Sequence, residues 1–524
     1  MRSFSLTVLF IAGSVTAGLA QTPDADDLVW QKSVQKYDAH RAALLKSADQ
    51  TVAKGPFRAD WTSLKTYKVP EWYQDAKFGI FIHWGLYSVP AFDSEWYPRD
   101  MYLVGGKDFQ HHVATYGPQS KFGYKDFIPN FKAEKFDASA WADLFRKSGA
   151  KYVIPVAEHH DGFPMYSSDL TDWSAAKLGP KQDVVGELAT AVRAAGLHFG
   201  ASSHRAEHYF FFNGGREFDS DVRDPRYASF YGPAHAGVTD KNHQEWAGHP
   251  DRAYLNDWLA RCVEIVQKYH PEVVWFDWWI NTKEFEPYLQ RFASFYYNDA
   301  AKNGYTAAIN YKYNAFPDSA AVLDIERGQL DASRHLLWQT DTSVSVKSWG
   351  YIKGDSFRTP ESLIQELVDI VSKNGCLLLN IGPRPDGTIP EEAQRILLDM
   401  GRWLSNNGEA IYGARPWKLY GEGPTKVAGG AFHDTATDTY SSQDIRFTTK
   451  GQTLYAIALG WPKDGKLTIK SLGTGSAQGD FKIRNIQLLG SDQKLKWNRD
   501  NTGLKLDLPS QKPGEYAFVF KITS

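Results

Sequence analysis

The sequence predicts a (β/α)8-like TIM barrel followed by a C-terminal β-sandwich. First, short apolar runs alternate with helical segments between residues 78 and 383, which is typical of parallel βαβ units. Second, each apolar run ends in polar residues, as barrel strands do at the face where chemistry occurs. Third, no glycine-rich phosphate turn follows the first run, which disfavours a doubly wound sheet.

The composition restricts the class of partner. Among 524 residues, 59 are basic and 61 acidic, and the formal net charge is −2. This balance, without a run of basic residues, argues against a nucleic-acid partner. Aromatic residues make up 14% of the chain, with 18 tryptophans, which suits the apolar faces of sugars but also builds cores.

Residues 1–20 have the pattern of a signal peptide. Arg2 precedes an apolar stretch, 6–17, and the small residues 18–20 form a cleavage site before Gln21. The apolar stretch is too short for a stable membrane span, and no later one is long enough. We therefore expect an exported protein, periplasmic or secreted, with a barrel domain over 21–430 and a sandwich over 431–524.

Eight strands are expected in the barrel. We place them at 78–83, 152–157, 198–202, 273–277, 306–310, 320–325, 336–339 and 376–383. Helices are expected at 140–148, with Ser139 as the N-cap, and at 183–195, 254–269 and 361–372. A polar helical segment, 24–59, precedes the barrel.

The pattern of apolar and polar residues changes after Trp417. Short alternating runs at 444–448, 453–458, 466–469 and 516–520 are separated by Gly, Asp and Lys turns, which predicts the sandwich. The two cysteines, Cys262 and Cys376, fall in a predicted helix and a predicted buried strand, so two buried thiols are favoured over a bridge. No ligand cluster with zinc spacing is visible in the sequence.

Polar side chains at the strand ends should gather at one rim of the barrel. They include imidazoles, an amide and two carboxylates: His83, His159, His160, His204, Asp277, Asn310 and Glu326. This set suits a neutral polyol, and two carboxylates are the minimum for glycoside hydrolysis. A single histidine is more often structural, and Asp277 alone could cap the next helix. The His159-His160 doublet before Asp161-Gly162 is harder to explain by packing.

Several long motifs occur in one order between residues 72 and 417. They are 78–85, 158–163, 171–173, 348–351 and 377–387. Together they resemble glycoside hydrolase family 29, the α-L-fucosidases. The resemblance implies a retaining double displacement in a (β/α) barrel, without metal or cofactor. It also implies that a fucosylated oligosaccharide or glycoconjugate is the substrate and that L-fucose is released from its non-reducing end.

The resemblance also assigns roles to residues. The family nucleophile falls on Asp277, and the best match for the acid/base is Glu326, with Asp341 as the runner-up. The expected substrate contacts are His83, Glu95, Trp96, His159, His160, Trp275, Lys312 and Trp349.

Three departures from the family pattern bear on these roles. Many members have a tyrosine after the third strand, where this chain has Ser202-Ser203-His204-Arg205. A common arginine appears as Lys312, which cannot make a bidentate contact. Some members have a Trp-Glu pair where this chain has Trp338-Gln339. The glutamine cannot act as an acid, so this change removes a competitor of Glu326. Two alternatives are a non-catalytic glycan-binding protein, expected to have lost one carboxylate, and a glycosidase for a fucose-like sugar such as L-galactose.

Overall fold

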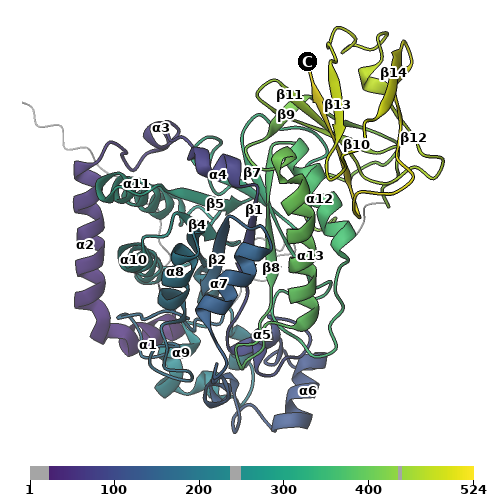
Figure 1. The fold of residues 1–524 in the computed structure, drawn as a ribbon. Helices are drawn as coiled ribbons and strands as arrows, with labels where there is room; N and C mark the ends of the chain where they lie inside the picture. Colours follow the sequence, from purple (N-terminus) through teal and green to yellow (C-terminus); the bar gives the residue numbers. More distant parts are fainter. Residues whose placement is uncertain (1–22, 237–248, 435–438) are drawn as a thin grey trace, which may run out of the picture.

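Residues 23–236, 249–434 and 439–524 are described by a computed structural model of the chain (Figure 1). The predicted signal peptide, residues 1–20, lies outside these ranges. Within them, no helix combines the length and the apolar character that crossing a bilayer requires.

Four α-helices precede the first barrel strand, and the first two are the longest of them. α1 (Ala25–Val34) begins at Asp24, whose carboxylate accepts hydrogen bonds from the backbone of Asp26 and Asp27. α2 (Asp38–Lys54) packs against α10 (Arg252–Tyr269) and α11 (Glu286–Asn303) and adds an outer layer to that side of the barrel (Figure 1). The shorter helices are α3 (Trp61–Leu64), α4 (Glu71–Ala76), α5 (Tyr97–Asp100), α6 (Lys107–Tyr116) and α9 (Ala228–Tyr231).

The predicted barrel is confirmed: eight parallel strands follow one another in sequence order, and the eighth pairs with the first. The strands are β1 (Phe78–Ile82), β2 (Tyr152–Glu158), β3 (His198–Ser203), β4 (Val273–Phe276), β5 (Ala308–Lys312), β6 (Val322–Glu326), β7 (Trp338–Ser343) and β8 (Gly375–Ile381). Each of the eight predicted strands overlaps one of them.

The fifth, sixth and seventh strands continue past their predicted ends. Lys312 and Glu326 are the last residues of β5 and β6, and Asp341 lies within β7. The apolar pattern ends earlier than the hydrogen-bonded ladder because these charged side chains are compensated by one another. Residues expected in loops therefore lie on the rigid barrel wall.

Further helices cover the outside of the barrel: α7 (Ala138–Lys147), α8 (Val184–Ala194), α12 (Pro360–Ser372) and α13 (Glu391–Asn407). The prediction that Ser139 caps α7 is wrong. Asp137 is the N-cap, and its carboxylate accepts from the backbone of Ser139 and Ala140. An aspartate two residues earlier can satisfy two otherwise unpaired amides at once.

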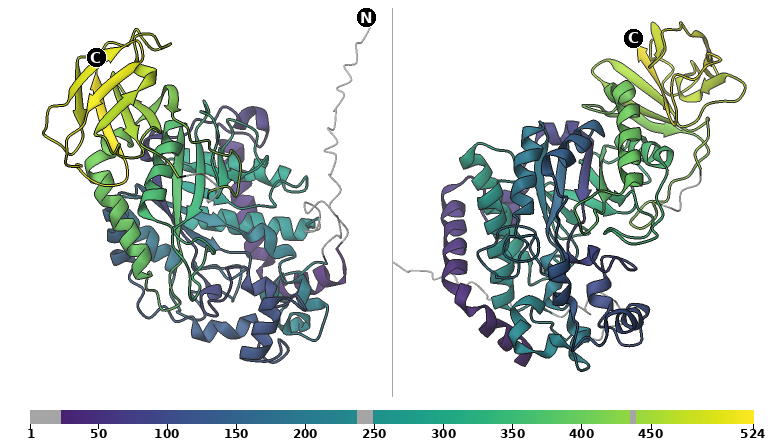
Figure 2. Two further views of the ribbon diagram at one scale, coloured as in Figure 1. Left: turned by 90° about the vertical axis from the view of Figure 1, so that its right-hand side faces the viewer. Right: turned by 60° about the horizontal axis from the view of Figure 1, so that its bottom comes forward.

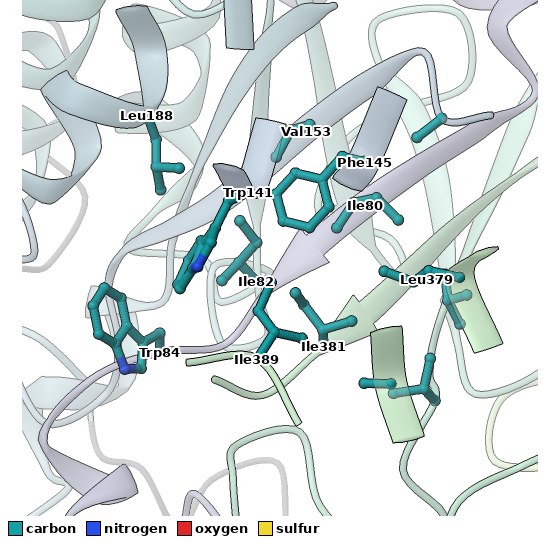
Figure 3. Close-up of a cluster of buried hydrophobic side chains, with 14 of the residues drawn as sticks. Ile80, Ile82, Trp84, Trp141, Phe145, Val153, Leu188, Leu379, Ile381 and Ile389 are labelled. Atoms are coloured by element: carbon teal, nitrogen blue, oxygen red, sulfur yellow. The ribbon is translucent and has the colours of Figure 1, made fainter. Parts of the chain in front are cut away.

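The main core lies between the barrel wall and these helices. Ile80 and Ile82 of β1 point outward to α7, where Trp141 and Phe145 cover them (Figure 3). Phe81, between them, belongs to a second buried cluster inside the barrel. This alternation follows the two-residue period of a strand. Cys262 on α10 and Cys376 on β8 are both buried and free, as predicted.

The C-terminal domain has two antiparallel sheets and forms a separate lobe beside α12 and α13 (Figures 1 and 2). One sheet has the order β13-β16-β11-β10-β9 and the other β12-β15-β14. The strands are β9 (Arg415–Glu422), β10 (Ile445–Lys450), β11 (Thr453–Ala458), β12 (Lys466–Ile469), β13 (Asn485–Leu488), β14 (Lys496–Asp500), β15 (Gly503–Asp507) and β16 (Phe518–Thr523). β9 begins before the predicted division at 430/431.

Polar contacts join the sandwich to the barrel helices. Arg446 on β10 pairs with Asp369 on α12, and Lys373 binds the other oxygen of the same carboxylate at 2.6 Å. All three side chains are buried. Trp403 on α13 donates to the carbonyl of Ala517 at 2.8 Å. The interface therefore contains buried charge as well as apolar surface.

Candidate active site

A pocket of about 460 Å3 opens at the carboxyl ends of the barrel strands. Nine of the predicted site residues line it: His83, Glu95, Trp96, His159, His160, Trp275, Asp277, Glu326 and Trp349. The tenth, Lys312, does not belong to the lining. The lining also includes His204, which was expected at the same rim, and Asp341, the runner-up acid. The residues that were not predicted are Ser94, Glu207, Trp278, Trp279, Arg327, Lys347 and Phe432.

Asp277 follows β4 and is held by two imidazoles. Its Oδ2 accepts a hydrogen bond from His204 Nδ1 at 2.9 Å and lies 3.5 Å from His160 Nε2. Burial alone would raise the pKa of this carboxyl, but the charge interaction and hydrogen bond with His204 hold the pKa well below its usual range. Asp277 is therefore ionised near neutral pH, as a nucleophile must be.

His204 is the first residue after β3. Its Nδ1 donates to Asp277, and its Nε2 lies 2.9 Å from the hydroxyl oxygen of Ser202, within hydrogen-bond distance. The next residue, Arg205, is buried and pairs with Asp257 at 2.7 Å and with Glu158. These ion pairs fix the turn after β3 and so position the imidazole against the nucleophile.

The pocket histidines His83, His159 and His160 are uncharged near neutral pH. Burial lowers the pKa of His83 and His159 well below the usual value and that of His160 to about 3. His83 Nδ1 contacts the Asn380 side-chain oxygen at 2.8 Å. Neutral imidazoles can both donate to and accept from hydroxyl groups, which makes this wall of the pocket suitable for a polyol.

Glu95 connects two loops of the pocket. Its Oε2 accepts from the hydroxyl of Ser348 at 3.0 Å and from the backbone of Trp349 at 2.8 Å. The indole of Trp349 is thereby held near the imidazole of His83, with ring centroids 5.1 Å apart. Trp96 packs 5.3 Å from His160 on another side. Aromatic walls of this kind bind the C–H faces of sugars.

Glu326 is the last residue of β6 and accepts a hydrogen bond from the indole N–H of Trp278. Lys312 Nζ lies 3.7 Å from the same carboxylate oxygen. Burial and the nearby charge of Asp277 raise the pKa of Glu326 to about 7, against the lowering effect of Lys312. A carboxyl that exchanges its proton near neutral pH is suited to general acid and base catalysis.

The prediction that Lys312 contacts substrate is not supported by its position. Its ammonium group binds Asp324 Oδ1 at 2.9 Å and also Asp341, and the side chain is 3% exposed. It lies over the ring of Trp275, 4.9 Å from the centroid, on the barrel side of the pocket. Lys312 therefore contacts carboxyls of the site and does not line the pocket itself.

Asp341, the alternative acid, is less exposed than Glu326 and lies closer to the ammonium group of Lys312. Its side chain is 2% exposed against 12% for Glu326, and Lys312 binds it directly. Burial and the charge of Asp324 raise the pKa of Asp341 well above its usual range. Gln339, at the position of a rival acid in some relatives, lies inside the barrel and accepts hydrogen bonds from Tyr73 and Tyr152 at 2.7 Å.

Two residues that line the pocket could not be recognised as site residues from the sequence. Glu207 follows His204 in a short 3-10 turn, and its Oε2 lies 3.5 Å from His160 Nδ1. Burial, followed by repulsion from Asp277, raises the pKa of Glu207 well above its usual value. Phe432 lies in the part assigned to the sandwich, yet its backbone N–H donates to the carbonyl of Glu326 at 2.9 Å.

Two groups in the pocket have ligand atoms close enough to hold a metal ion. They are His83, His159 and His204, and His160, His204 and Asp277, with the atoms of each group within 4.8 Å of one another. His204 belongs to both groups, and its two nitrogens already contact Ser202 and Asp277. The expected absence of a metal stays a prediction.

A barrel pocket with one carboxylate held ionised, one carboxyl that titrates near pH 7, and walls of indole and neutral imidazole defines a glycoside hydrolase. The family model for α-L-fucosidase matches residues 44–409, and the model for the α-L-fucosidase C-terminal domain matches 437–523. The chain belongs to the α-L-fucosidases of glycoside hydrolase family 29, as the sequence motifs indicated.

Individual relatives match over most of their length. Human tissue α-L-fucosidase is 32% identical over 486 residues, which cover 89% of this chain and 92% of the relative. The enzyme of Macaca fascicularis is 33% identical over 505 residues, covering 92% and 95%. The crystal structure of Thermotoga maritima α-fucosidase with a mechanism-based inhibitor is 30% identical, with a TM-score of 0.71, and covers 89% of this chain and all of its own.

Proposed function

We propose that the protein hydrolyses terminal α-L-fucosyl linkages of glycans with retention of configuration, using Asp277 as nucleophile and Glu326 as acid/base. The observation that carries the proposal is the opposite behaviour of two carboxyls in one pocket. The pKa of Asp277 is held well below its usual range, whereas that of Glu326 is raised to about 7. Near neutral pH one is a carboxylate and the other can deliver a proton.

In the first step Asp277 Oδ attacks the anomeric carbon and forms a covalent fucosyl ester. The bond to the leaving oxygen breaks, and Glu326 transfers its proton to that oxygen. In the second step Glu326 accepts a proton from water, whose oxygen attacks the anomeric carbon and releases Asp277. Two inversions give net retention, and Glu326 is protonated again at the end.

The walls of the pocket support the choice of sugar. L-Fucose has hydroxyls that need paired donors and acceptors, which His83, His159 and His160 can supply as neutral imidazoles. Its methyl group and C–H face need apolar contacts, and the indoles of Trp96, Trp275 and Trp349 line the same cavity.

The proposal is tested with a panel of 4-nitrophenyl glycosides followed by proton NMR of the product. We expect α-L-fucoside to be cleaved with the highest kcat/KM, and α-L-fucose to appear before its β anomer. If the enzyme cleaved an α-L-galactoside with a higher kcat/KM than the α-L-fucoside, L-galactose would replace L-fucose as the proposed substrate sugar. Initial release of β-L-fucose would overturn retention, and binding of fucose without any turnover would indicate a glycan-binding protein.

We further propose that residues 1–20 direct export, with cleavage before Gln21 and a periplasmic or secreted mature protein. The proposal is supported by the order of this segment, in which a positive residue is followed by an apolar stretch and then by small residues. N-terminal sequencing of the protein from an exporting host should begin at Gln21. A mature chain that still begins at Met1 would contradict it.

A further inference from the structure

Three aromatic side chains pack together beside Glu326: Trp278 and Phe432 line the pocket, and Tyr313 packs on Trp278. Trp278 follows Asp277, Tyr313 follows β5, and Phe432 comes from the segment after β9. The ring of Trp278 lies 4.3 Å from that of Tyr313 and 5.8 Å from that of Phe432, measured between centroids. We call Trp278, Tyr313 and Phe432 the aromatic rim.

The rim exposes aromatic surface that folding alone does not require. Tyr313 is 49% exposed and Phe432 is 54% exposed. In the part of the chain that the structure describes, the other large aromatic side chain with comparable exposure is Trp497, in the sandwich at 38%. Clustered apolar exposure beside a pocket marks a binding surface, whereas single exposed residues are ordinary.

The backbone at the rim is also unusual. Tyr313 and Phe432 have φ values of 53° and 61°, in the left-handed region that side chains with a Cβ seldom adopt. Trp279 and Arg327, which also line the pocket, have φ values of 72° and 42°. Strained conformations at successive loops persist when the surrounding fold enforces them, and they cluster at sites that bind ligands.

Two residues of the rim form hydrogen bonds with Glu326, the proposed acid. The indole N–H of Trp278 donates to the carboxylate of Glu326, and the backbone N–H of Phe432 donates to the Glu326 carbonyl at 2.9 Å. The oxygen that Glu326 protonates must come within about 3 Å of its carboxyl. The sugar attached to that oxygen must therefore begin next to Trp278.

We propose that the aromatic rim is the subsite for the leaving group, and that it binds a pyranose by stacking the sugar's C–H face on the rings. The inference rests on the proposed function and extends it to the second sugar of the substrate. The rings of the rim fit the C–H face of a pyranose, and Trp278, Tyr313 and Phe432 require no charge on that sugar.

The test compares two substrates that share fucose and differ in the leaving group. α-L-Fucosyl fluoride releases fluoride and has no ring to stack, whereas a fucosyl-galactose disaccharide has one. Tyr313→Ala and Phe432→Ala should each lower kcat/KM for the disaccharide by about tenfold, because a lost stacking contact has that order of effect. Both variants should cleave the fluoride within about threefold of the wild-type rate.

Two matched variants serve as controls. Tyr313→Phe keeps the ring and should retain the wild-type ratio of disaccharide to fluoride activity. Trp497→Ala removes an exposed aromatic side chain from the sandwich and should change neither activity. Because Tyr313, Phe432 and Trp497 are all exposed, shortening them leaves no buried cavity and should not prevent folding.

Transfer to an added sugar gives an independent readout. Once the fucosyl ester has formed from the fluoride, a sugar hydroxyl can replace water: Glu326 takes its proton, a new glycosidic bond forms and Asp277 is released. With excess lactose as acceptor, Tyr313→Ala should lower the ratio of transfer to hydrolysis about tenfold. If the wild type cleaves the fluoride but the variants keep both ratios, the rim inference is wrong and the proposed function stands. If the wild type does not cleave the fluoride, both fail.

Discussion

The two halves of the barrel rim have opposite effects on the pKa of a buried carboxyl. After β1 to β4 lie four imidazoles and Asp277, here called the imidazole half (His83, His159, His160, His204 and Asp277). On β5 to β7 lie one ammonium group and three carboxyls, the lysine half (Lys312, Asp324, Glu326 and Asp341). In the first half a single carboxylate receives a direct hydrogen bond from His204. In the second, three carboxyls share one cation.

The difference shows that, for these two buried carboxyls, the partners around each group decide which one keeps its proton. Burial acts on both Asp277 and Glu326 in the same direction. His204 and its neighbours outweigh it for Asp277, whereas Lys312 cannot neutralise Asp324, Asp341 and Glu326 together. One half therefore stabilises an anion, and the other retains a proton close to pH 7.

The largest effect is expected from removing the anion of the imidazole half. Asp277→Ala should lower kcat by more than about a thousandfold, because no other group can form the ester. Azide should partly restore turnover and give fucosyl azide of inverted configuration. Glu207→Gln is the control: this neighbouring carboxyl holds its proton, so the amide resembles it and activity should fall less than about tenfold. An Asp277→Ala enzyme with a tenth of wild-type activity would refute the assignment.

The second effect concerns the proton of the lysine half. Glu326→Gln should lower kcat/KM for a fucosyl disaccharide by about a hundredfold or more, the usual contribution of a general acid. Wild-type activity should fall as the pH rises through about 7, because only the protonated carboxyl is an acid, and this basic limb should vanish in the variant.

The same variant should keep much of its reactivity toward α-L-fucosyl fluoride, whose leaving group needs no proton in the first step. Asp341→Asn provides the comparison on the neighbouring strand. The Asp341→Asn enzyme should keep the basic limb of the pH profile and the wild-type ratio of disaccharide to fluoride activity. The opposite outcome, with the leaving-group signature in Asp341→Asn and not in Glu326→Gln, would identify Asp341 as the acid.

A smaller effect should follow from changing the donor to Asp277. His204→Phe keeps a buried ring but loses the hydrogen bond, so kcat/KM at pH 7 should fall about tenfold to a hundredfold. The pKa of Asp277 should rise, and the acidic limb of the pH profile should move to higher pH because the nucleophile must be ionised. His204→Gln, which retains a donor, should show a smaller shift. An unchanged acidic limb in His204→Phe would mean that the imidazole does not control Asp277.

The smallest effect on turnover is expected from Lys312→Met. Without the ammonium group the pKa of Glu326 should rise further, and the basic limb should move to higher pH by about one unit. The free energy of unfolding should also fall by about 3–5 kcal/mol, because buried carboxylates lose their cation. Lys373→Met, at another buried pair far from the pocket, should lower stability without moving the limb. A basic limb that moved to lower pH in Lys312→Met would reverse our account of the lysine half.

Sequence alone predicted the barrel because strand and helix periods are local. It also drew attention to Asp277, since a carboxylate at the end of a buried strand is costly without a use, and the structure places this carboxylate in the pocket; its role as nucleophile stays a prediction. It misplaced Lys312, because the residue's role depends on the register that puts it beside Asp324 of the next strand. Such a register is not encoded in any one segment. Phe432 was missed for a related reason: it reaches the pocket from a segment more than a hundred residues after Glu326.

Asp369, whose carboxylate binds Lys373 of the barrel and Arg446 of the sandwich, limits how the two domains can be inherited. A barrel that acquired a different sandwich would keep a buried carboxylate with one of its two cations missing, and β9 would lose its partner β10. Exchange between lineages would therefore succeed only when the incoming domain carried an arginine at the corresponding position of its strand. Barrel and sandwich are thus expected to descend as a pair rather than as interchangeable modules.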